Sequence, residues 1–246
     1  MPARILRQSG DVKEVFKRFV EEKKAREHQA RERRIDEEFP GFVAAFLKPL
    51  AGAAARRRER QNENKGEDGE TWASLGLWLL LPRTWILMND IVIQTGPTEF
   101  AQIDHLVLGP GGLFLVETKT WQGALLVKGD DWLRKSGRAW KRVQSPTRQH
   151  QRHKDVLLKW LKGKGFPVAE EMVHAVVLIR GASWLKVEDA TMPIFEGTFS
   201  LAWHIRHSGK RSPGLSQDLA LTIAQSLQEA EPFPGQGLPK ASRTEG

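Results

Sequence analysis

Three charged residues in the middle of the chain have the types and the spacing of a hydrolytic site. Asp104 lies in a β-rich run over residues 102–108, and Glu117 and Lys119 lie in a second run over residues 113–119. The glycine- and proline-rich segment between the runs predicts an antiparallel hairpin with a loop of about four residues. Counting back from that loop places Asp104 opposite Glu117, and the period of two along a strand puts Lys119 on the same face.

The predicted face of this hairpin combines apolar and acidic side chains. Its leucines nearer the loop are Leu106, Leu108, Leu113 and Leu115. Two carboxylates held together beside such a surface repel each other and need a cation. A divalent metal bound by Asp104 and Glu117, with Lys119 beside it, would supply the cation and assemble the parts for hydrolysing a phosphodiester. The structural alternative is an ion pair between Glu117 and Lys119 on a solvated strand face, with Asp104 as a strand-edge residue.

The motifs around these residues resemble the nuclease-related domain (NERD), a branch of the PD-(D/E)xK nuclease superfamily. They are Gln102-Ile103-Asp104-His105, the Gly-Gly-Leu-Phe-Leu-Val-Glu-Thr-Lys run over residues 111–119, Gly123, Trp132, and Ser145-Pro146 followed by Gln149. The resemblance covers roughly residues 66–180. It implies a restriction-endonuclease-like core and Mg²⁺-dependent cleavage of DNA, with Mn²⁺ as an alternative metal. It also implies that Asp104 and Glu117 are metal ligands and that Lys119 is a catalytic lysine.

The same resemblance indicates which residues support the site. The family typically has an acidic residue at the start of the helix before the hairpin, and Glu70 matches it, with Glu67 as a rival one turn earlier. A first-turn acid that complements the helix dipole is the structural alternative. Gln149 lies where the superfamily often has a glutamine that supports the active site. In the expected mechanism the backbone carbonyl of Thr118 completes the metal ligands, and Lys119 orients the attacking water or stabilises the developing charge.

Basic residues follow the hairpin closely in sequence and favour nonspecific contact with phosphates. The candidates are Arg134, Lys135, Arg138, Lys141, Arg142, Arg148 and Arg152. His150 and His153 lack the i,i+4 spacing of a helical metal pair, so they are predicted to lie at the surface or to face phosphates. Trp132 is interpreted as a core residue rather than a platform for stacking bases.

The elements that must position these residues alternate between helices and strands. This order predicts an α/β domain with a mixed central β-sheet flanked by helices. The expected organisation is a basic, charged helical arm and linker over residues 1–65, a nuclease-like domain over residues 66–210, and a closing helix with a disordered tail over residues 211–246. A capping-box pattern at Asp11 and Glu14 begins the arm, which is a candidate for self-association or a protein contact.

Periodicity and breakers predict the remaining elements. Helices are expected over residues 71–81, 147–162 and 215–227, and strands over residues 85–93, 123–127 and 173–179, with residues 199–205 as a further candidate strand. In the first of these helices Trp72, Leu75, Leu79 and Leu80 fall on or near one side. Asn89 and Asp90 mark an irregularity inside their strand.

Composition limits the partners and the compartment. The chain has 246 residues, a formal net charge of +8 and no cysteine, so disulfides and thiolate metal sites are excluded. Residues 1–65 contain 17 Lys and Arg against 11 Asp and Glu, which gives +6 of that charge. A basic protein favours polyanionic partners. With neither a signal-like start nor an apolar run that spans a bilayer, the sequence predicts a soluble, cytoplasmic protein that does not enter membranes.

The expected function is therefore a metal-dependent nuclease, with DNA favoured over RNA as the substrate. One alternative is a catalytically silent nucleic-acid-binding or scaffold protein built on a nuclease-like core. Another is an interaction protein that works through the N-terminal helix. Metal-dependent turnover separates the nuclease from the silent binding protein. Deleting residues 1–65 and measuring DNA affinity against salt tests the interaction protein, because loss of phosphate contacts flattens the salt dependence.

Overall fold

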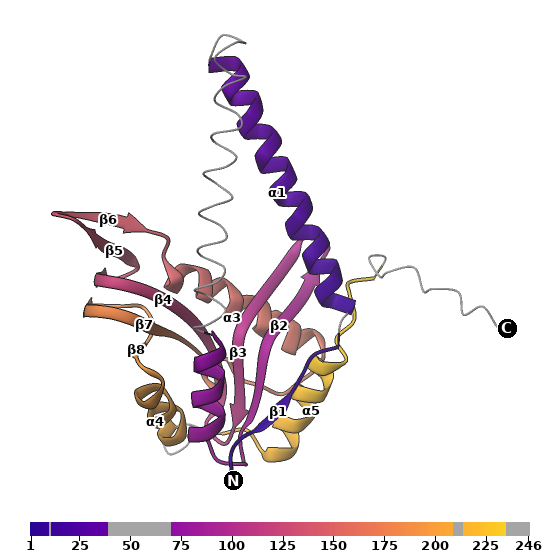
Figure 1. Cartoon of the computed structure of the whole chain (residues 1–246). Coiled ribbons are helices and arrows are strands. Elements are labelled where there is room, and N and C mark those ends of the chain that lie inside the picture. The colour runs from indigo at the N-terminus through magenta and orange to yellow at the C-terminus, as the bar shows by residue number, and fades with distance from the viewer. Residues whose placement is uncertain (10, 39–69, 209–213, 235–246) are drawn as a thin grey trace.

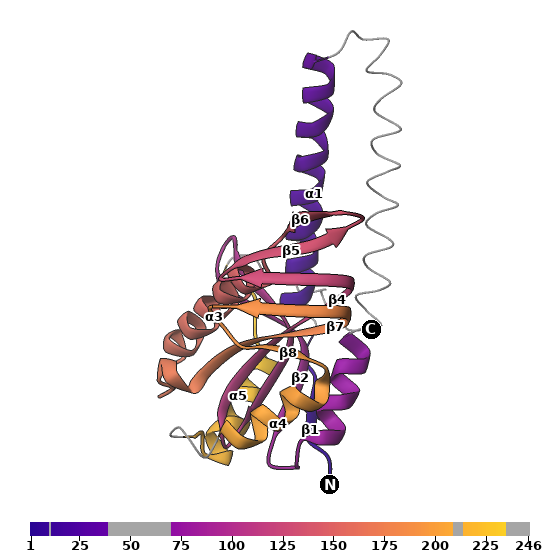
Figure 2. The same cartoon turned by 90° about the vertical axis from the view of Figure 1, so that its left-hand side faces the viewer.

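The fold is an eight-stranded mixed β-sheet with helices on both faces, which confirms the predicted α/β class (Figure 1, Figure 2). The computed structural model describes residues 1–9, 11–38, 70–208 and 214–234. The strands are β1 (Arg4–Leu6), β2 (Ile86–Gly96), β3 (Glu99–Gly109), β4 (Gly112–Lys128), β5 (Asp131–Ser136), β6 (Ala139–Val143), β7 (Val173–Glu188) and β8 (Ile194–Glu196). The helices are α1 (Asp11–Glu38), one over residues 70–80, α3 (Pro146–Gly163), α4 (Thr198–Ser208) and α5 (Gln217–Gln228), with a short 3-10 turn at Glu170–Met172.

The sheet is organised around β4, which has partners along both edges. Strands β1 to β6 lie in sequence order, while β7 pairs with the other edge of β4 and β8 pairs with β7. The β4–β7 and β7–β8 pairs are parallel, and the pairs that join β2 through β6 are antiparallel. One long strand therefore connects the two halves of the sheet.

The predicted hairpin is formed by β3 and β4 in the expected register. Leu108 pairs with Leu113, and the chain reverses through Pro110 and Gly111 between the paired Gly109 and Gly112. All four leucines of the predicted face are buried against α3 and α5. This apolar contact fixes the register, because a slip of one residue would turn those leucines to the other face of the sheet.

Two apolar layers cover the sheet. The layer on one face contains side chains of α3 and α5, and the layer on the other contains side chains of the helix over residues 70–80 and of α4. Figure 1 shows these helices on opposite sides of the strands. Asp104 of β3 and Glu117 and Lys119 of β4 therefore extend from strands that helices cover on both faces.

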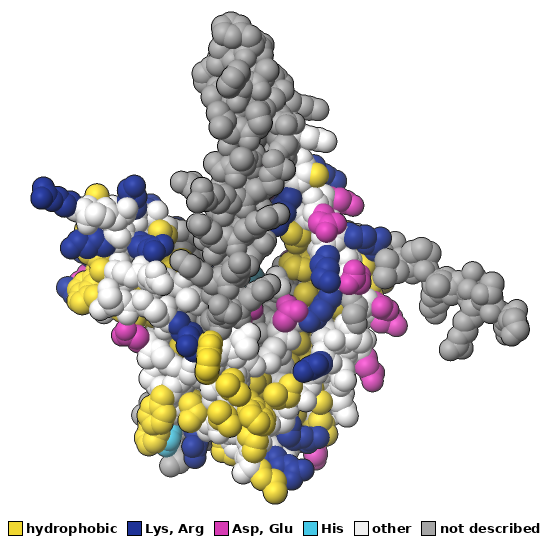
Figure 3. Space-filling model, in the orientation of Figure 1, with side chains coloured by type: hydrophobic (Ala, Val, Ile, Leu, Met, Phe, Trp, Pro, Cys, Tyr) yellow, Lys and Arg dark blue, Asp and Glu magenta, His cyan; other side chains and the backbone are white. Residues whose placement is uncertain are grey.

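The helix over residues 70–80 buries a different side from the one its pattern suggested. Ala73 and Leu77 are buried against the sheet, whereas Trp72 is 61% exposed and Leu75 and Leu79 are exposed as well. Apolar residues occur around most of this helix, so periodicity alone cannot select the buried side. With the exposed Phe199 and Trp203 of α4, these residues form an apolar area over the two helices, where Figure 3 shows hydrophobic side chains gathered.

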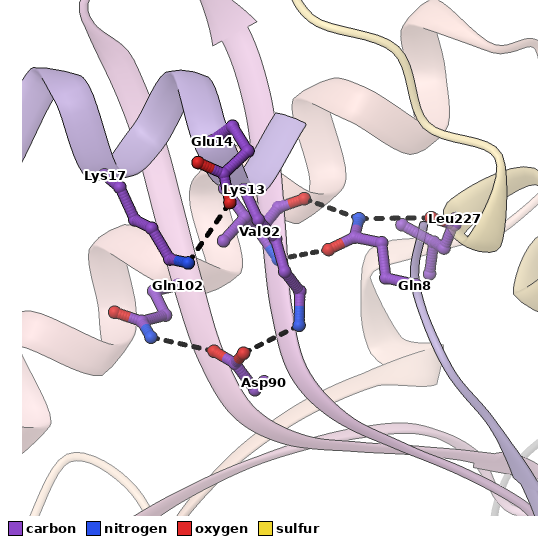
Figure 4. Close-up of polar contacts among 8 residues, drawn as sticks. All are labelled: Gln8, Lys13, Glu14, Lys17, Asp90, Val92, Gln102 and Leu227. Atoms are coloured by element: carbon purple, nitrogen blue, oxygen red, sulfur yellow. Dashed lines mark hydrogen bonds and ion pairs between the residues drawn. The ribbon is translucent and has the colours of Figure 1, made fainter. Parts of the chain in front are cut away.

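The N-terminal residues join the sheet directly. Strand β1 pairs in parallel with β2, and Val12 and Val15 of α1 are buried. The side chain of Gln8 donates to the carbonyl oxygens of Val92 and Leu227 at 2.8 and 3.1 Å and accepts from the Val92 N–H at 2.9 Å (Figure 4). The domain boundaries stay predictions, yet β1 pairs within the sheet and α5, near the other end of the chain, packs against it.

Two element predictions need correction. Residues 199–205, a candidate strand, lie inside helix α4. The predicted strand over residues 123–127 is the second half of β4, which continues through a register shift at Gly123. Glu67, most of the predicted linker and the end of the tail lie outside the described residues. None of the described helices has the length and apolarity needed to cross a membrane.

Candidate active site

The candidate site lies where one edge of β4 lacks a neighbouring strand. Along that edge β3 pairs with residues 112–116 and β5 pairs with residues 125–128, while β7 follows the opposite edge. In the ladders that the structure describes, residues 117–124 form an interval between β3 and β5. Glu117, Thr118 and Lys119 begin this interval, so their surroundings are made by side chains instead of a strand.

Asp104 lies at the point where β3 separates from β4. The described ladder between these strands ends at His105 and Val116, and the Asp104 carboxylate then accepts a hydrogen bond from the Thr118 N–H at 2.8 Å. The neighbouring β2 is irregular at the same level, because Asp90 has a φ of 51°, as the sequence pattern of that strand predicted. Asp104 is thereby fixed beside the strand that carries Glu117.

Glu117 and Lys119 form an ion pair inside the protein. The Lys119 ammonium lies 2.6 Å from Glu117 Oε1, and the side chain of Glu117 is 2% exposed against 28% for Lys119. The structural alternative predicted an ion pair between these residues on a solvated strand face. The ion pair is present, but it lies inside the protein and not on a solvated face. A buried charge pair of this kind costs free energy to form, because both groups lose their contacts with water. Groups with perturbed pKa values cluster at functional sites, so a functional role would explain why this pair is present.

The pKa values around the site indicate crowded negative charge. Burial raises the pKa of Asp104 well above its usual value, and the carboxylates of Glu117 and Glu70 raise it further, against the lowering effect of the Thr118 N–H. Burial acts to lower the pKa of Lys119, but the carboxylates of Glu117, Asp104 and Glu70 together outweigh it, with Glu117 contributing most, so that pKa is raised. The lysine therefore stays charged among three carboxylates.

Glu70 is the first residue of its helix and is half-buried. Its influence on the pKa values of Asp104 and Lys119 places it within electrostatic reach of both. The position is compatible with the role that the family resemblance implies and with the helix-dipole alternative alike.

His150 and His153 are not the surface residues that their spacing suggested. His150 is fully buried and His153 is 14% exposed, and the Nδ1 atom of each lies 3.7 Å from Glu117 Oε2. Burial lowers the pKa of both imidazoles, that of His150 to about 4. They lie three residues apart on the stripe of α3 that continues through the buried Leu157 and Trp160, so helical periodicity was the signal that could have placed them.

Gln149 lies on a neighbouring side of α3. It is half-buried and lines a cavity of about 290 Å³ together with Arg142, Arg148 and Arg152. The described hydrogen bonds around Asp104, Glu117 and Lys119 do not involve its side chain. Its supporting role stays a prediction, and the cavity offers basic groups for a phosphate.

The other basic candidates lie on and around the β5–β6 hairpin. Arg142 and Arg148 pair with Asp131 at 3.1 and 3.3 Å, and Arg134 donates to the Gln122 carbonyl at 3.0 Å. Lys135, Arg138 and Lys141 are exposed. Figure 1 shows the hairpin projecting from the body, and Figure 3 shows Lys and Arg side chains gathered at that projection.

Two tryptophan environments occur near this hairpin. Trp132 is buried, as predicted, and its ring NH donates to Thr147 at 3.2 Å. Trp140 of β6 and Trp184 of β7 are exposed and form a ring contact with centroids 6.1 Å apart. The hairpin therefore combines exposed cations with an exposed aromatic pair.

The residues at the opening in the sheet fit a divalent cation. The Glu117 carboxylate raises the pKa of Asp104, and Glu117 Oε2 is buried with no hydrogen-bond donor among the described residues. Carboxylate and carbonyl oxygens are ligands that Mg²⁺ and Mn²⁺ accept. Asp104, Glu117 and the Thr118 carbonyl would hold the ion, with Lys119 at its side.

The candidate site lies within a segment that matches a known family. Residues 65–179 match the family model of the nuclease-related domain, so this segment of the chain is similar to the NERD family. The chain is also 29% identical over 131 residues to an uncharacterized protein of Bacillus anthracis, a match that covers 52% of this chain and 60% of that protein. The chain thus spans less than two thirds of the relative's length. No solved structure matches the chain at a significant level.

Proposed function

We propose that the protein is a metal-dependent nuclease that hydrolyses phosphodiester bonds, with DNA as the favoured substrate. The observation that carries this proposal is the convergence of Asp104 and Glu117 on the charged Lys119 in a strand-free interval of β4, within the segment that matches the NERD family. Phosphodiester hydrolysis requires carboxylates that can bind a metal ion and a charged group beside them that stabilises the phosphate. Asp104, Glu117 and the charged Lys119 are such groups.

Each side chain has a distinct part in the proposed reaction. Asp104 and Glu117, with the Thr118 carbonyl, hold Mg²⁺ or Mn²⁺, which when bound polarises the phosphate and lowers the pKa of the attacking water. The Lys119 ammonium stabilises the negative charge that develops on the phosphate oxygens. Glu70 adds negative charge at the same opening, and Gln149 lies at the adjoining basic cavity.

Cleavage assays test the proposal directly. Supercoiled plasmid, linear duplex, single-stranded DNA and RNA are incubated with Mg²⁺ or Mn²⁺ and with wild type, Lys119→Ala or Lys128→Ala. Loss of the ammonium at the reacting phosphate lowers the rate by about 100-fold or more. Lys128 lies on the same strand in an exposed ion pair with Glu188, so its variant keeps the wild-type rate.

Circular dichroism must show that all three preparations are folded. A folded wild type that cuts none of the substrates, or equal cutting by Lys119→Ala, rejects the proposal. Binding without cutting would favour the alternative of a catalytically silent nucleic-acid-binding protein.

The surface proposed to hold nucleic acid is the β5–β6 hairpin. Lys135, Arg138 and Lys141 supply exposed cations for phosphates, and the Trp140–Trp184 pair supplies aromatic faces for unpaired bases. Replacing the three cations by alanine lowers the affinity for duplex DNA. It also flattens the plot of log affinity against log salt by about 0.9 for each phosphate that the variant no longer neutralises.

The matched control replaces three exposed lysines away from the hairpin, Lys17, Lys162 and Lys164. Fluorescence anisotropy at several salt concentrations measures both slopes. Identical slopes for the two triple variants would exclude the hairpin as the binding surface.

A further inference from the structure

Three buried polar atoms converge at the candidate site, and none of them has a hydrogen-bond partner in the part of the chain that the structure describes. They are Glu117 Oε2, His150 Nδ1 and His153 Nδ1. Each nitrogen lies 3.7 Å from the carboxylate oxygen, and the three atoms lie within 4.8 Å of one another. Leaving three such atoms unpartnered in a protein interior is unfavourable, so their convergence indicates a species that binds all of them.

The hydrogen bonds of the neighbouring atoms show which lone pairs that species meets. His150 Nε2 lies 2.9 Å from the Leu115 carbonyl oxygen, which only accepts, so Nε2 carries the proton and Nδ1 presents a lone pair. Lys119 engages Glu117 through Oε1 and leaves Oε2 for another partner. A lone pair of His150 thus faces a carboxylate oxygen, and a cation between them would convert repulsion into two bonds.

The spacing suits a first-row transition metal. Ligand atoms about 2.0–2.1 Å from a tetrahedral ion lie about 3.3 Å apart, so the observed 3.7 Å separations need only a small contraction. Imidazole nitrogens suit Fe²⁺, Ni²⁺, Cu²⁺ and Zn²⁺, and the Glu117 carboxylate makes the mixed set acceptable to Mn²⁺ as well, whereas Mg²⁺ prefers oxygen ligands alone. Metal-binding histidines usually donate their other ring N–H to a carbonyl or carboxylate oxygen, as His150 does to Leu115.

We propose that Glu117, His150 and His153 form a nitrogen-containing site for a divalent transition metal. This goes beyond the proposed function, because an oxygen-ligated Mg²⁺ at Asp104 and Glu117 needs neither imidazole. Glu117 is common to both ligand sets, so a transition metal bound through His150 and His153 would lie beside the proposed reaction centre. The partial exposure of His153 gives the site contact with solvent.

Pulsed electron paramagnetic resonance of Mn²⁺ tests the site through its ligands. Metal-stripped protein is saturated with Mn²⁺, so that an oxygen-ligated ion cannot hide a nitrogen-ligated one, and the spectrum is expected to contain couplings from directly bound ¹⁴N. Growth with ¹⁵N-histidine should replace those couplings by the ¹⁵N pattern, which assigns them to imidazole without any mutation. A wild-type spectrum that lacks nitrogen couplings at bound Mn²⁺ overturns the proposal.

Variants then locate the ligands. His153→Gln should weaken Mn²⁺ binding in calorimetry by about tenfold or more and remove its nitrogen coupling, whereas His207→Gln, in the ring contact with Trp203 on α4, should change neither. An unchanged coupling in folded His153→Gln would exclude that ligand. Nitrogen couplings without DNA cleavage would support this metal site and reject the proposed nuclease function. DNA cleavage without nitrogen couplings would support the nuclease function and reject this metal site.

Discussion

At the scale of single residues, burial and neighbouring carboxylates together set the charge of each group at the opening in the sheet. Burial lowers the pKa of His105 and of His150 to about 4, so both imidazoles are neutral near pH 7. The carboxylate of Glu117 acts in the opposite direction on Lys119 and keeps it charged. Near pH 7 the site therefore contains the charged Lys119 ammonium and neutral imidazoles that present lone pairs.

The neutral His105 predicts a pH-dependent stability. Its pKa falls from an ordinary 6.5 to about 4 on folding, so the unfolded chain binds more protons between these values. Above pH 6.5 the titration of His105 leaves the free energy of unfolding unchanged. As the pH falls from 6.5 toward 4, it lowers that free energy progressively. Between pH 7 and pH 5 this one group lowers the free energy of unfolding by about 2 kcal/mol.

Urea unfolding in EDTA measures this effect in wild type and in His105→Gln. The amide can keep a hydrogen bond to Asn89, which lies 2.9 Å from His105 Nδ1. The other histidines titrate in both proteins, so they cancel in the difference. The same loss of stability on acidification in both proteins would contradict the prediction.

The residue types at 104, 117 and 119 could be predicted as a cluster because strand register follows from alternation and from the loop. The two histidines of α3 could not be placed by a rule for paired ligands on one helix. Their site includes Glu117, which lies on another element, and only the packing of α3 against β4 brings the three together.

At the scale of elements, the β3–β4 hairpin determines the separation of Asp104 from Glu117. Its turn depends on Gly112, which has a φ of 115° and whose Cα lies against the Met172 backbone. A Cβ added at this position would lie 2.4 Å from the Met172 carbonyl oxygen. Both the conformation and the close approach therefore exclude a side chain.

Gly112→Ala should destabilise the protein by about 3 kcal/mol or more, because backbone strain and the clash act together. Gly137→Ala is the matched control, since Gly137 also has a positive φ, of 60°, but has no atom within 4 Å of an added Cβ. Strain alone predicts a loss of about 1 kcal/mol there. Chemical denaturation compares the two, and equal losses would exclude the proposed contact with Met172.

The hairpin was predictable, whereas the environment of two helices was not. Residues 199–205 mix aromatic, aliphatic and polar side chains in a pattern that suits either period, and contacts with β8 and the sheet select the helix. The helix over residues 70–80 is apolar on several sides, so its buried side depends on where α4 lies. Gly76 permits this contact, since an added Cβ would lie 2.7 Å from the Thr198 side chain.

At the scale of the whole molecule, strand β2 connects the two ends of the chain. On one side it pairs with β1, and Gln8 joins it to the end of α5. Figure 1 shows α1 extending from this junction away from the body of the protein. The order of motifs along the chain suggested a separate arm, and only the three-dimensional pairing reveals that its first residues belong to the sheet.

Gln8→Ala should lower the free energy of unfolding by about 2–3 kcal/mol, because buried backbone groups of Val92 and Leu227 lose their partner. Gln151→Ala removes an exposed glutamine that bonds Asp155, and its effect should stay below about 0.5 kcal/mol. Thermal and urea unfolding of both variants measure the difference. A loss for Gln8→Ala no larger than that for Gln151→Ala would mean that the junction contributes little to stability.

The ring contact between Trp140 and Trp184 gives the protein an optical signal of its own. The chain contains nine tryptophans and no tyrosine, so its intrinsic fluorescence comes from indole alone. Two indoles 6.1 Å apart and tilted by 49° are close enough for their electronic transitions to couple, and both are exposed to quenchers. Trp121 and Trp132 form a second close pair, with centroids 5.7 Å apart, so the difference in indole-band circular dichroism between wild type and Trp140→Phe would isolate the signal that reports movement of the β5–β6 hairpin relative to β7.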